Sequence, residues 1–340
     1  MRKTAVSIKG VNFCINGEET FKGKTWRGHS IEGLLPNSRM VNGIFDDQTD
    51  STRYRWIYPD TKVWDAERNV SEFIENMSLW REHGLLAFTI NLQGGSPQGY
   101  TANKQHPWCN TAITPEGELK ADYMSRLERV IDRADELGMV VIVGVYYFGQ
   151  EHYVNNEEAI KKGLENSVRW ILERGYTNVL LEVVNETSCF KTSIFRPERI
   201  HELIALAKEV MVDGRTLLVS TSYGGGHIPS NKVIALSDYI LLHGNGRHKP
   251  EQIVEMVEKT RMREAYTPKP IVFNEDDHFD FDKPWNNFVA ATIVGASWGY
   301  FDFRKPGAAY EEGYQCIPAH WGITTTKKIG FFSLVKEWSE

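Results

Sequence analysis

Hydrophobic and polar positions along the chain alternate between two patterns. Short runs of consecutive apolar residues are typical of strands covered on both faces. Segments with apolar residues every three or four positions are typical of helices. The first pattern predicts strands at 40–45, 85–91, 139–148, 178–186, 217–223, 239–245, 271–275 and 297–303. The second predicts helices at 67–83, 123–137, 157–174, 197–211, 250–264, 284–294 and 327–338. Eight strands that alternate with helices predict a (β/α)8 TIM barrel, and one domain over residues 1–340 is the simplest organisation.

Two features lie outside this repeat. Before the first barrel strand, apolar residues alternate with polar ones from Val6 to Ile15, and the turn-forming pair Asn16-Gly17 follows. This pattern predicts an N-terminal β-hairpin over residues 6–22. Two long segments, about 93–120 and 304–326, leave the C-terminal ends of strands two and eight. Segments of this length are usually functional or disordered, so we expect them to wall a cleft or to be surface excursions.

Composition narrows the function classes. The chain has 340 residues, of which 41% are hydrophobic and 25% charged, an ordinary balance for a globular protein. A net charge of −6 without a basic run gives no sign of nucleic-acid binding. The four cysteines form no CxxC pair, so neither a zinc motif nor a disulfide framework is expected. No apolar run has the length of a signal peptide or a membrane span. We therefore expect a soluble protein, cytoplasmic if the chain is complete and secreted or periplasmic if a leader was removed, and leave its oligomeric state open.

Polar residues gather at the predicted C-terminal strand ends, the face on which barrels build their active sites. We expect one residue from each strand to line this face: Asn42, Asn91, Tyr147, Glu186, Tyr223, His243, Glu275 and Trp298. Strands four and seven both end in Asn-Glu, at 185–186 and 274–275. A single such pair is more often a helix cap or a surface pair. Two of them on facing strands favour the pair of carboxylates that cleaves a glycosidic bond.

The strand-four segment Leu181-Glu-Val-Val-Asn-Glu186 resembles the Tyr-Glu-Ile-x-Asn-Glu signature of clan A retaining glycoside hydrolases. The resemblance is strongest to family five, the cellulase and mannanase group. It implies that Glu186 is the acid/base catalyst, that Glu275 is the nucleophile, and that a carbohydrate is the substrate. It also implies substrate contacts from Asn185, His243, Trp298 and Arg39, and strand-end positions add Asn42, Asn91, Tyr147 and Asn245.

The sequence also departs from that family pattern. Thr187 replaces the usual proline after the acid/base residue, Asp276-Asp277-His278 replaces the usual aromatic residue and glycine, and Asn245 stands where a tyrosine is usual. These departures indicate a divergent relative, and they put in doubt the hydrogen bond that the tyrosine gives to the nucleophile.

Two other functions remain open at this stage. The replaced tyrosine and the unusual nucleophile flank leave room for a carbohydrate-binding barrel without catalysis. A metal-dependent barrel hydrolase would need two histidines near strand one, where His29 stands alone. The acidic residues Asp276, Asp277, Asp280 and Asp282 with His278 offer oxygen ligands for a cation, but a solvated loop is the favoured interpretation. We expect no cofactor and no metal.

Overall fold

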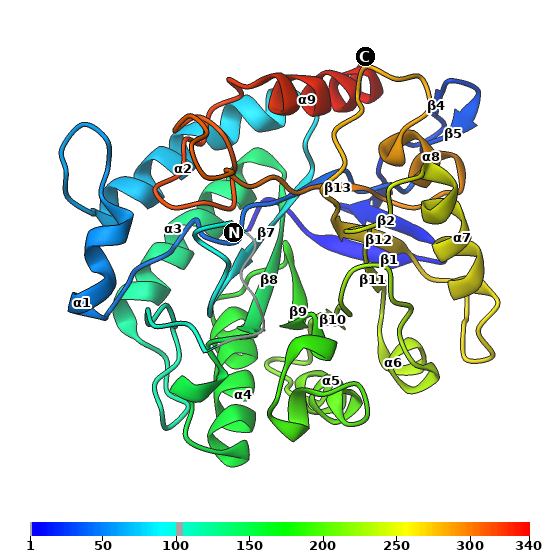
Figure 1. The fold of residues 1–340 in the computed structure, drawn as a ribbon. Coiled ribbons are helices and arrows are strands. Elements are labelled where there is room, and N and C mark those ends of the chain that lie inside the picture. Colours follow the sequence, from blue (N-terminus) through cyan, green and yellow to red (C-terminus); the bar gives the residue numbers. More distant parts are fainter. Residues whose placement is uncertain (1, 100–104) are drawn as a thin grey trace.

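The computed structural model describes residues 2–99 and 105–340. Parallel strands form the centre of the molecule (Figure 1). The strands are β6 (Asn37–Arg39), β7 (Ala87–Asn91), β8 (Val140–Tyr147), β9 (Val179–Asn185), β10 (Leu218–Ser220), β11 (Ile240–His243), β12 (Ile271–Glu275) and β13 (Gly299–Tyr300). One sheet has the order β10-β9-β8-β7-β6-β13, and β11 pairs with β12. Parallel bridges from Val272 to Ser297 and from Asp276 to Tyr300 join β12 to β13.

The remaining junction lies between β10 and the start of β11. The Asp238 N–H donates to the Val219 carbonyl at 2.9 Å, and the Val219 N–H donates to the Asp238 carboxylate at 2.8 Å. The strands therefore follow one another around the centre in chain order, and the (β/α)8 barrel predicted from the sequence is confirmed.

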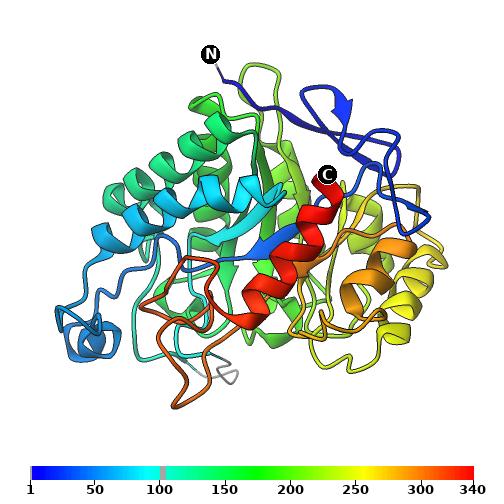
Figure 2. The ribbon, with the colours of Figure 1, turned by 90° about the horizontal axis from the view of Figure 1, so that it is seen from above.

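Helices surround these strands, as Figure 2 shows from a second direction. They are α1 (Asp50–Arg53), α2 (Ala66–Glu82), α3 (Ala121–Leu137), α4 (Glu157–Glu173), α5 (Ile200–Glu209), α6 (Asn231–Leu236), α7 (Pro250–Arg261), α8 (Asn287–Ile293) and α9 (Thr326–Ser339). Single 3-10 turns lie at η1 (Tyr54–Trp56), η2 (Glu151–Tyr153), η3 (Thr187–Cys189) and η4 (Ser193–Phe195). The short helices α1 and α6 were not predicted, and α5 begins at Ile200 rather than at 197 because η4 precedes it. Side-chain oxygens of Asp65, Asn156 and Asn286 accept from backbone N–H groups and cap α2, α4 and α8.

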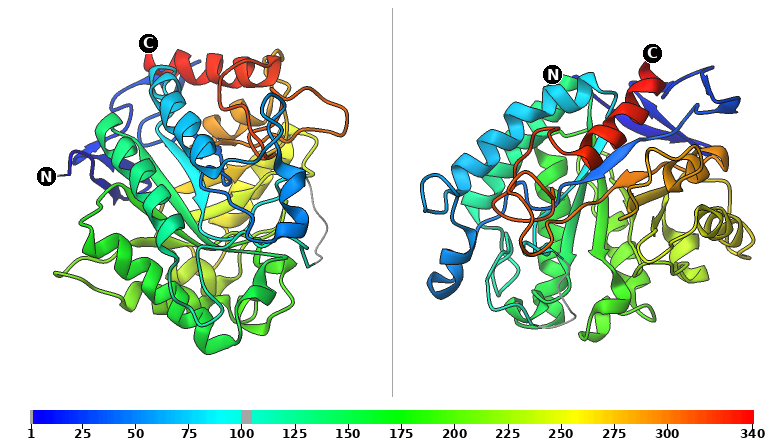
Figure 3. Two further views of the ribbon diagram at one scale, coloured as in Figure 1. Left: turned by 90° about the vertical axis from the view of Figure 1, so that its left-hand side faces the viewer. Right: turned by 45° about the horizontal axis from the view of Figure 1, so that its top comes forward.

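The N-terminal segment forms a three-stranded antiparallel sheet rather than a two-stranded hairpin. Its strands are β1 (Val6–Lys9), β2 (Asn12–Ile15) and β3 (Glu18–Glu19), and a two-stranded ribbon of β4 (Thr25–Trp26) and β5 (His29–Ser30) follows. Phe13 is fully buried against barrel residues such as Leu180 and Leu241. The N-terminal sheet lies at one end of the barrel and segment 301–325 at the other, as the left view of Figure 3 shows. The sheet therefore covers the N-terminal ends of the strands and leaves the opposite end for a site.

The first barrel strand is the main error in the predicted elements. Residues 40–45 form turns, in which the N–H groups of Gly43 and Phe45 donate to the carbonyls of Met40 and Asn42, and the strand is Asn37–Arg39 instead. The apolar side chains Met40, Ile44 and Phe45 are still buried. A run of apolar residues indicates that the segment is buried, but a buried turn, as found here, satisfies the pattern as well as a strand does.

The two long segments contact each other above the C-terminal strand ends. The first connects β7 to α3, and the second connects β13 to α9. The Ile317 N–H donates to the Pro97 carbonyl at 2.8 Å, and the Asn42 amide donates to the Gln315 carbonyl at 2.6 Å. Within residues 2–99 and 105–340, no helix combines the length and the apolar character that a membrane crossing requires.

Candidate active site

The two glutamates singled out in the sequence meet at the C-terminal end of the barrel. Glu275 is the last residue of β12, and Glu186 directly follows β9. A carboxylate oxygen of Glu186 and one of Glu275 lie within 4.8 Å of each other. The side chains are 14% and 7% exposed. Two glutamates that are 89 positions apart in the chain therefore bring two nearly buried carboxyl groups close together.

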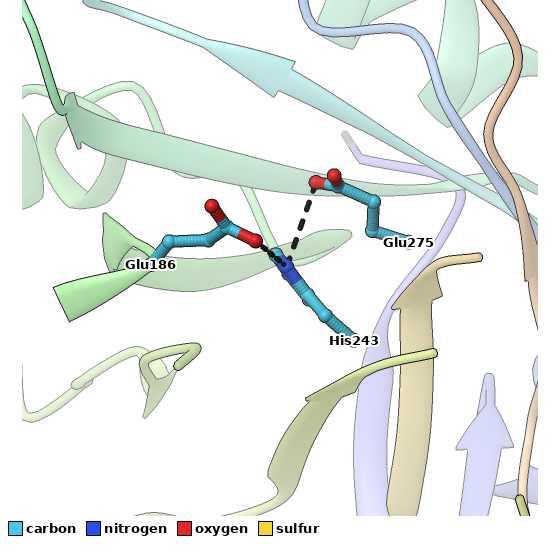
Figure 4. A group of neighbouring side chains, drawn as sticks. All are labelled: Glu186, His243 and Glu275. Atoms are coloured by element: carbon cyan, nitrogen blue, oxygen red, sulfur yellow. Dashed lines mark hydrogen bonds and ion pairs between the residues drawn. The ribbon is translucent and has the colours of Figure 1, made fainter. Parts of the chain in front are cut away.

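His243, the last residue of β11, lies between the two carboxyl groups (Figure 4). Its Nδ1 lies 3.0 Å from Oε1 of Glu186 and 3.6 Å from Oε2 of Glu275. Its Nε2 lies 4.0 Å from Oε1 of the buried Glu182. The imidazole is fully buried, so burial and the charges of its neighbours decide its protonation.

Arg39, the last residue of β6, supplies a permanent positive charge beneath the glutamates. Its Nε lies 2.6 Å from Oε2 of Glu275, and its Nη1 lies 3.4 Å from Oε2 of Glu182. Its Nη2 donates to Oδ1 of Asn185. The guanidinium is fully buried. A buried arginine of this kind requires carboxylate partners, and Glu275 and Glu182 provide them.

Asn245 provides the second contact to Glu275. Its side-chain amide donates to Oε1 at 2.7 Å, so each oxygen of Glu275 has its own protein donor. The asparagine at this position therefore supplies the neutral hydrogen bond that was in doubt because the usual tyrosine is missing.

The charges determine where protons reside. Burial raises the pKa of Glu275 above its ordinary value, although the charges of Arg39 and His243 oppose this. Burial also acts on Glu186, but the hydrogen bond and charge of His243 outweigh it and bring the pKa of Glu186 below its ordinary value. Burial lowers the pKa of His243, but the charges of Glu275 and Glu186 raise it overall. These directions favour a proton on His243, in contact with Glu186, over a proton on Glu186 itself.

A tight turn after β9 aims the Glu186 side chain. Glu186 adopts the left-handed conformation (φ 57°, ψ 65°), which costs an L-residue roughly 1–2 kcal/mol. Its N–H donates to Oγ of Ser222, and the Thr187 N–H donates to the Ser222 carbonyl, both at 3.0 Å. A proline at 187 has no N–H and would lose the second bond, which gives the unusual threonine a structural reason.

Trp298 does not reach this site. Its indole N–H donates to Asp276 at 2.9 Å, and its ring packs against Phe288 of α8 and Phe331 of α9. Side chains alternate along a strand: Ser297 bonds the Leu35 N–H at the barrel base, so the next residue faces the helices. Trp298 is fully buried in these contacts, so the contact with a sugar expected from the sequence does not fit its orientation.

Among the other residues expected at the site, Tyr147 and Asn42 contact the two long segments that follow β7 and β13. The Tyr147 hydroxyl is 2.7 Å from Oγ of Ser96, and burial together with the charges of Glu275 and Glu186 raises its pKa well above the ordinary value. A Cβ on Gly95 would lie 2.2 Å from Oδ1 of Asn42, so only glycine lets the β7–α3 segment pass so close. Asn91 is 2% exposed at the end of β7. Tyr147 and Asn42 thus anchor the segments that wall the site.

The acidic segment after Glu275 is largely satisfied by protein donors. One oxygen of Asp276 lies 2.6 Å from His278, and the other accepts from Asn287 and Trp298 at 2.9 Å each. Asp276, Asp277 and His278 are close enough to share a cation, as are Glu186, His243 and Glu275. In both groups an existing contact competes with a metal: the protein donors on Asp276, and the Arg39 guanidinium on Glu275.

Two residues of the candidate active site, Glu182 and Cys189, were given no role in it from the sequence. Glu182, a buried residue within β9, pairs with Arg39 and also faces His243. Cys189 was treated only as an isolated cysteine, yet its Sγ lies 3.4 Å from Oε2 of Glu186. The only local signal was its spacing, three residues after Glu186.

Comparison with known structures supports the fold. An endo-1,4-β-mannanase from Rhizomucor miehei matches with a TM-score of 0.58 and 12% identity, over 98% of each chain. A β-glucanase from Saccharophagus degradans, in complex with cellotetraose, matches with a TM-score of 0.56 and 12% identity, over 99% of this chain and 94% of that one. A longer chain from Bacteroides vulgatus also matches (TM-score 0.57, 12% identity), and this protein spans 60% of its length.

Sequence comparison adds no family. Models of known protein families give no match to the chain, and curated protein sequences give none either. The chain therefore has the barrel fold of the family 5 glycoside hydrolases at a sequence identity of about one residue in eight, as the 12% values show.

Proposed function

We propose that this protein is a retaining glycoside hydrolase that cleaves O-glycosidic bonds of an oligosaccharide or polysaccharide. The observation that carries the proposal is the separation of the two carboxyl groups, whose nearest oxygens lie within 4.8 Å. Retaining enzymes hold their carboxyl groups about 5–5.5 Å apart, whereas inverting enzymes leave about 6.5–9.5 Å for a water molecule. The proposal also draws on the fold, which the mannanase and the β-glucanase share.

In this mechanism Glu275 attacks the anomeric carbon while Glu186 protonates the departing oxygen. Arg39 and Asn245 hold one oxygen of Glu275 each, so the carboxylate has a fixed direction of attack. Glu186 then removes a proton from the incoming water, which hydrolyses the glycosyl ester. Arg39 binds the amide oxygen of Asn185, and the amide nitrogen, which has no hydrogen-bond partner within 2–99 and 105–340, can meet a sugar hydroxyl.

The protonation order requires one further step. When the proton is on His243, Glu186 is ionised and must first be protonated before it can act as the acid. Bound sugar excludes water, and in a less polar site a neutral Glu186–His243 pair is favoured over an ion pair. We therefore propose that substrate binding transfers the proton across the 3.0 Å contact from His243 to Glu186.

Leaving-group dependence tests the two roles. Glu186→Gln should lower kcat/KM for an unactivated oligosaccharide about 100-fold or more but spare kcat/KM for a dinitrophenyl glycoside, whose leaving group needs no proton. Glu275→Gln should abolish both activities, and Glu209→Gln, an exposed change on α5, should affect neither. Labelling of Glu275 by an activated fluoro-glycoside, together with a retained anomer in the first-formed product, would support the double displacement. A wild-type protein that binds sugars but hydrolyses none of them is a carbohydrate-binding barrel, and inverted product would make Glu275 a general base.

A further inference from the structure

We propose that the Cys189 thiol is a positioning residue that holds the acid/base carboxyl group of Glu186 through a second hydrogen bond. The inference rests on the proposed function, since it assigns Cys189 a part in the work of Glu186. Sγ of Cys189 lies 3.4 Å from Oε2 of Glu186, and Nδ1 of His243 lies 3.0 Å from Oε1. The two oxygens of the carboxyl group thus have separate partners on different elements, η3 and β11.

The backbone brings the thiol to this place. The Glu186 carbonyl accepts from the Cys189 N–H at 2.8 Å, which closes a 3-10 turn. This turn returns the chain toward Glu186, and the thiol of Cys189 meets the Glu186 carboxyl group. The spacing between Glu186 and Cys189 is therefore a requirement of the contact.

The neighbouring loop locks the turn in place. Oγ of Ser188 accepts from the Gly224 N–H at 3.0 Å. A Cβ on Gly224 would lie 2.8 Å from that oxygen and 3.9 Å from Sγ of Cys189, so glycine is what permits this approach. The backbone that carries the thiol is therefore held by contacts with Glu186 and with Gly224.

The thiol acts here as a donor. Burial, followed by the charge of Glu186, raises the pKa of Cys189 to about 12, so it stays protonated at neutral pH. A donor to a carboxylate favours the ionised form and lowers the carboxyl pKa. The other groups that face Glu186 are His243 on β11, Arg39 on β6 and Glu275 on β12, and none of them contacts Oε2 in place of the thiol among the described residues. Loss of the thiol should therefore raise the pKa of Glu186 and loosen its carboxyl group.

Carboxyl carbon NMR tests this directly. The protein is labelled with ¹³C at the glutamate carboxyl groups, and the Glu186 signal is assigned by its loss in Glu186→Gln. Cys189→Ala should raise the pKa of Glu186 by about 0.5 units, whereas Cys189→Ser, with a stronger donor, should leave it at or below the wild-type value. Cys109→Ala, which removes another half-buried thiol, should leave it unchanged. An unchanged Glu186 titration in both Cys189 variants would overturn the inference, whether or not the protein hydrolyses glycosides.

Kinetics provides the second readout. Cys189→Ala should lower kcat/KM for an oligosaccharide about threefold to tenfold, the worth of one hydrogen bond, and Cys189→Ser should restore it. The same variants should keep the wild-type kcat/KM for a dinitrophenyl glycoside, because departure of its leaving group does not need the acid. An equal loss on both substrates indicates a general structural defect and would refute the positioning role. A wild-type protein without hydrolase activity would refute the proposed function instead.

Discussion

Replacement of Arg39 by methionine tests the electrostatic account of the site. The guanidinium is fully buried and lies 2.6 Å from Glu275 and 3.4 Å from Glu182. Methionine has a similar length and no charge, so the variant leaves two buried carboxyl groups without their cation. Removal of one partner from a buried ion pair costs about 3–5 kcal/mol of folding free energy.

The size of the pKa shift follows from the same contact. Two unit charges about 4 Å apart interact by about 4 kcal/mol at an effective dielectric constant of about 20. At about 1.36 kcal/mol per unit, the pKa of Glu275 should rise by about 3 units in Arg39→Met. The group's folded-state pKa is then far above its unfolded value, so stability is lost as pH rises between the two. The stability deficit of the variant should therefore be larger at pH about 8 than at pH about 5.

Urea unfolding at both pH values and the pH profile of kcat/KM are the assays. Arg39→Met should show a pH-dependent stability deficit and an acidic limb shifted upward, and Arg39→Lys, which keeps the charge, should lie between it and the wild type. Arg126→Met is the matched control, because Arg126 is 5% exposed and pairs with Glu67 at 3.3 Å, away from the site. A deficit that is equal at the two pH values, with an unmoved acidic limb, would refute the reasoning.

Two further predictions concern the pH dependence of the activity and the N-terminal end of the barrel. The pH profile of kcat/KM should be bell-shaped. Its acidic limb should lie above 4.5 because the pKa of Glu275 is raised, and its alkaline limb above 6.5 because the pKa of His243 is raised. Steady-state kinetics across the pH range measures both limbs, and an alkaline limb below 6.5 contradicts the assignment. Phe13→Ala, which empties a fully buried position in the N-terminal sheet, should cost about 3–5 kcal/mol in urea unfolding. It should leave kcat/KM of the folded protein unchanged, because Phe13 lies at the opposite end of the barrel from Glu186; a selective loss of activity would show that the two ends are coupled.

The sequence by itself determined the barrel and the place of both glutamates. The strand β12 has the predicted bounds, and β9 differs by one residue at each end, because long apolar runs leave few other structures open to them. The carboxylates at the ends of these runs were recognisable because a buried strand has no structural need for a charge there. The spacing of apolar residues is also a local signal, and it placed most helix ends within a few residues.

Only the tertiary structure decided which polar groups meet. The face on which Trp298 lies depends on the register of β13 against β6, and the contact of Asn245 with Glu275 depends on how β11 pairs with β12. The ion pair between Arg39 and Glu275 joins residues 236 positions apart. Such contacts arise from strand pairing and barrel closure, which bring together residues whose own neighbours in the chain carry no trace of the partner. A local pattern can therefore predict that a side chain is buried at a strand end. Which partner it meets, and so which charge it carries, depends on the closed barrel.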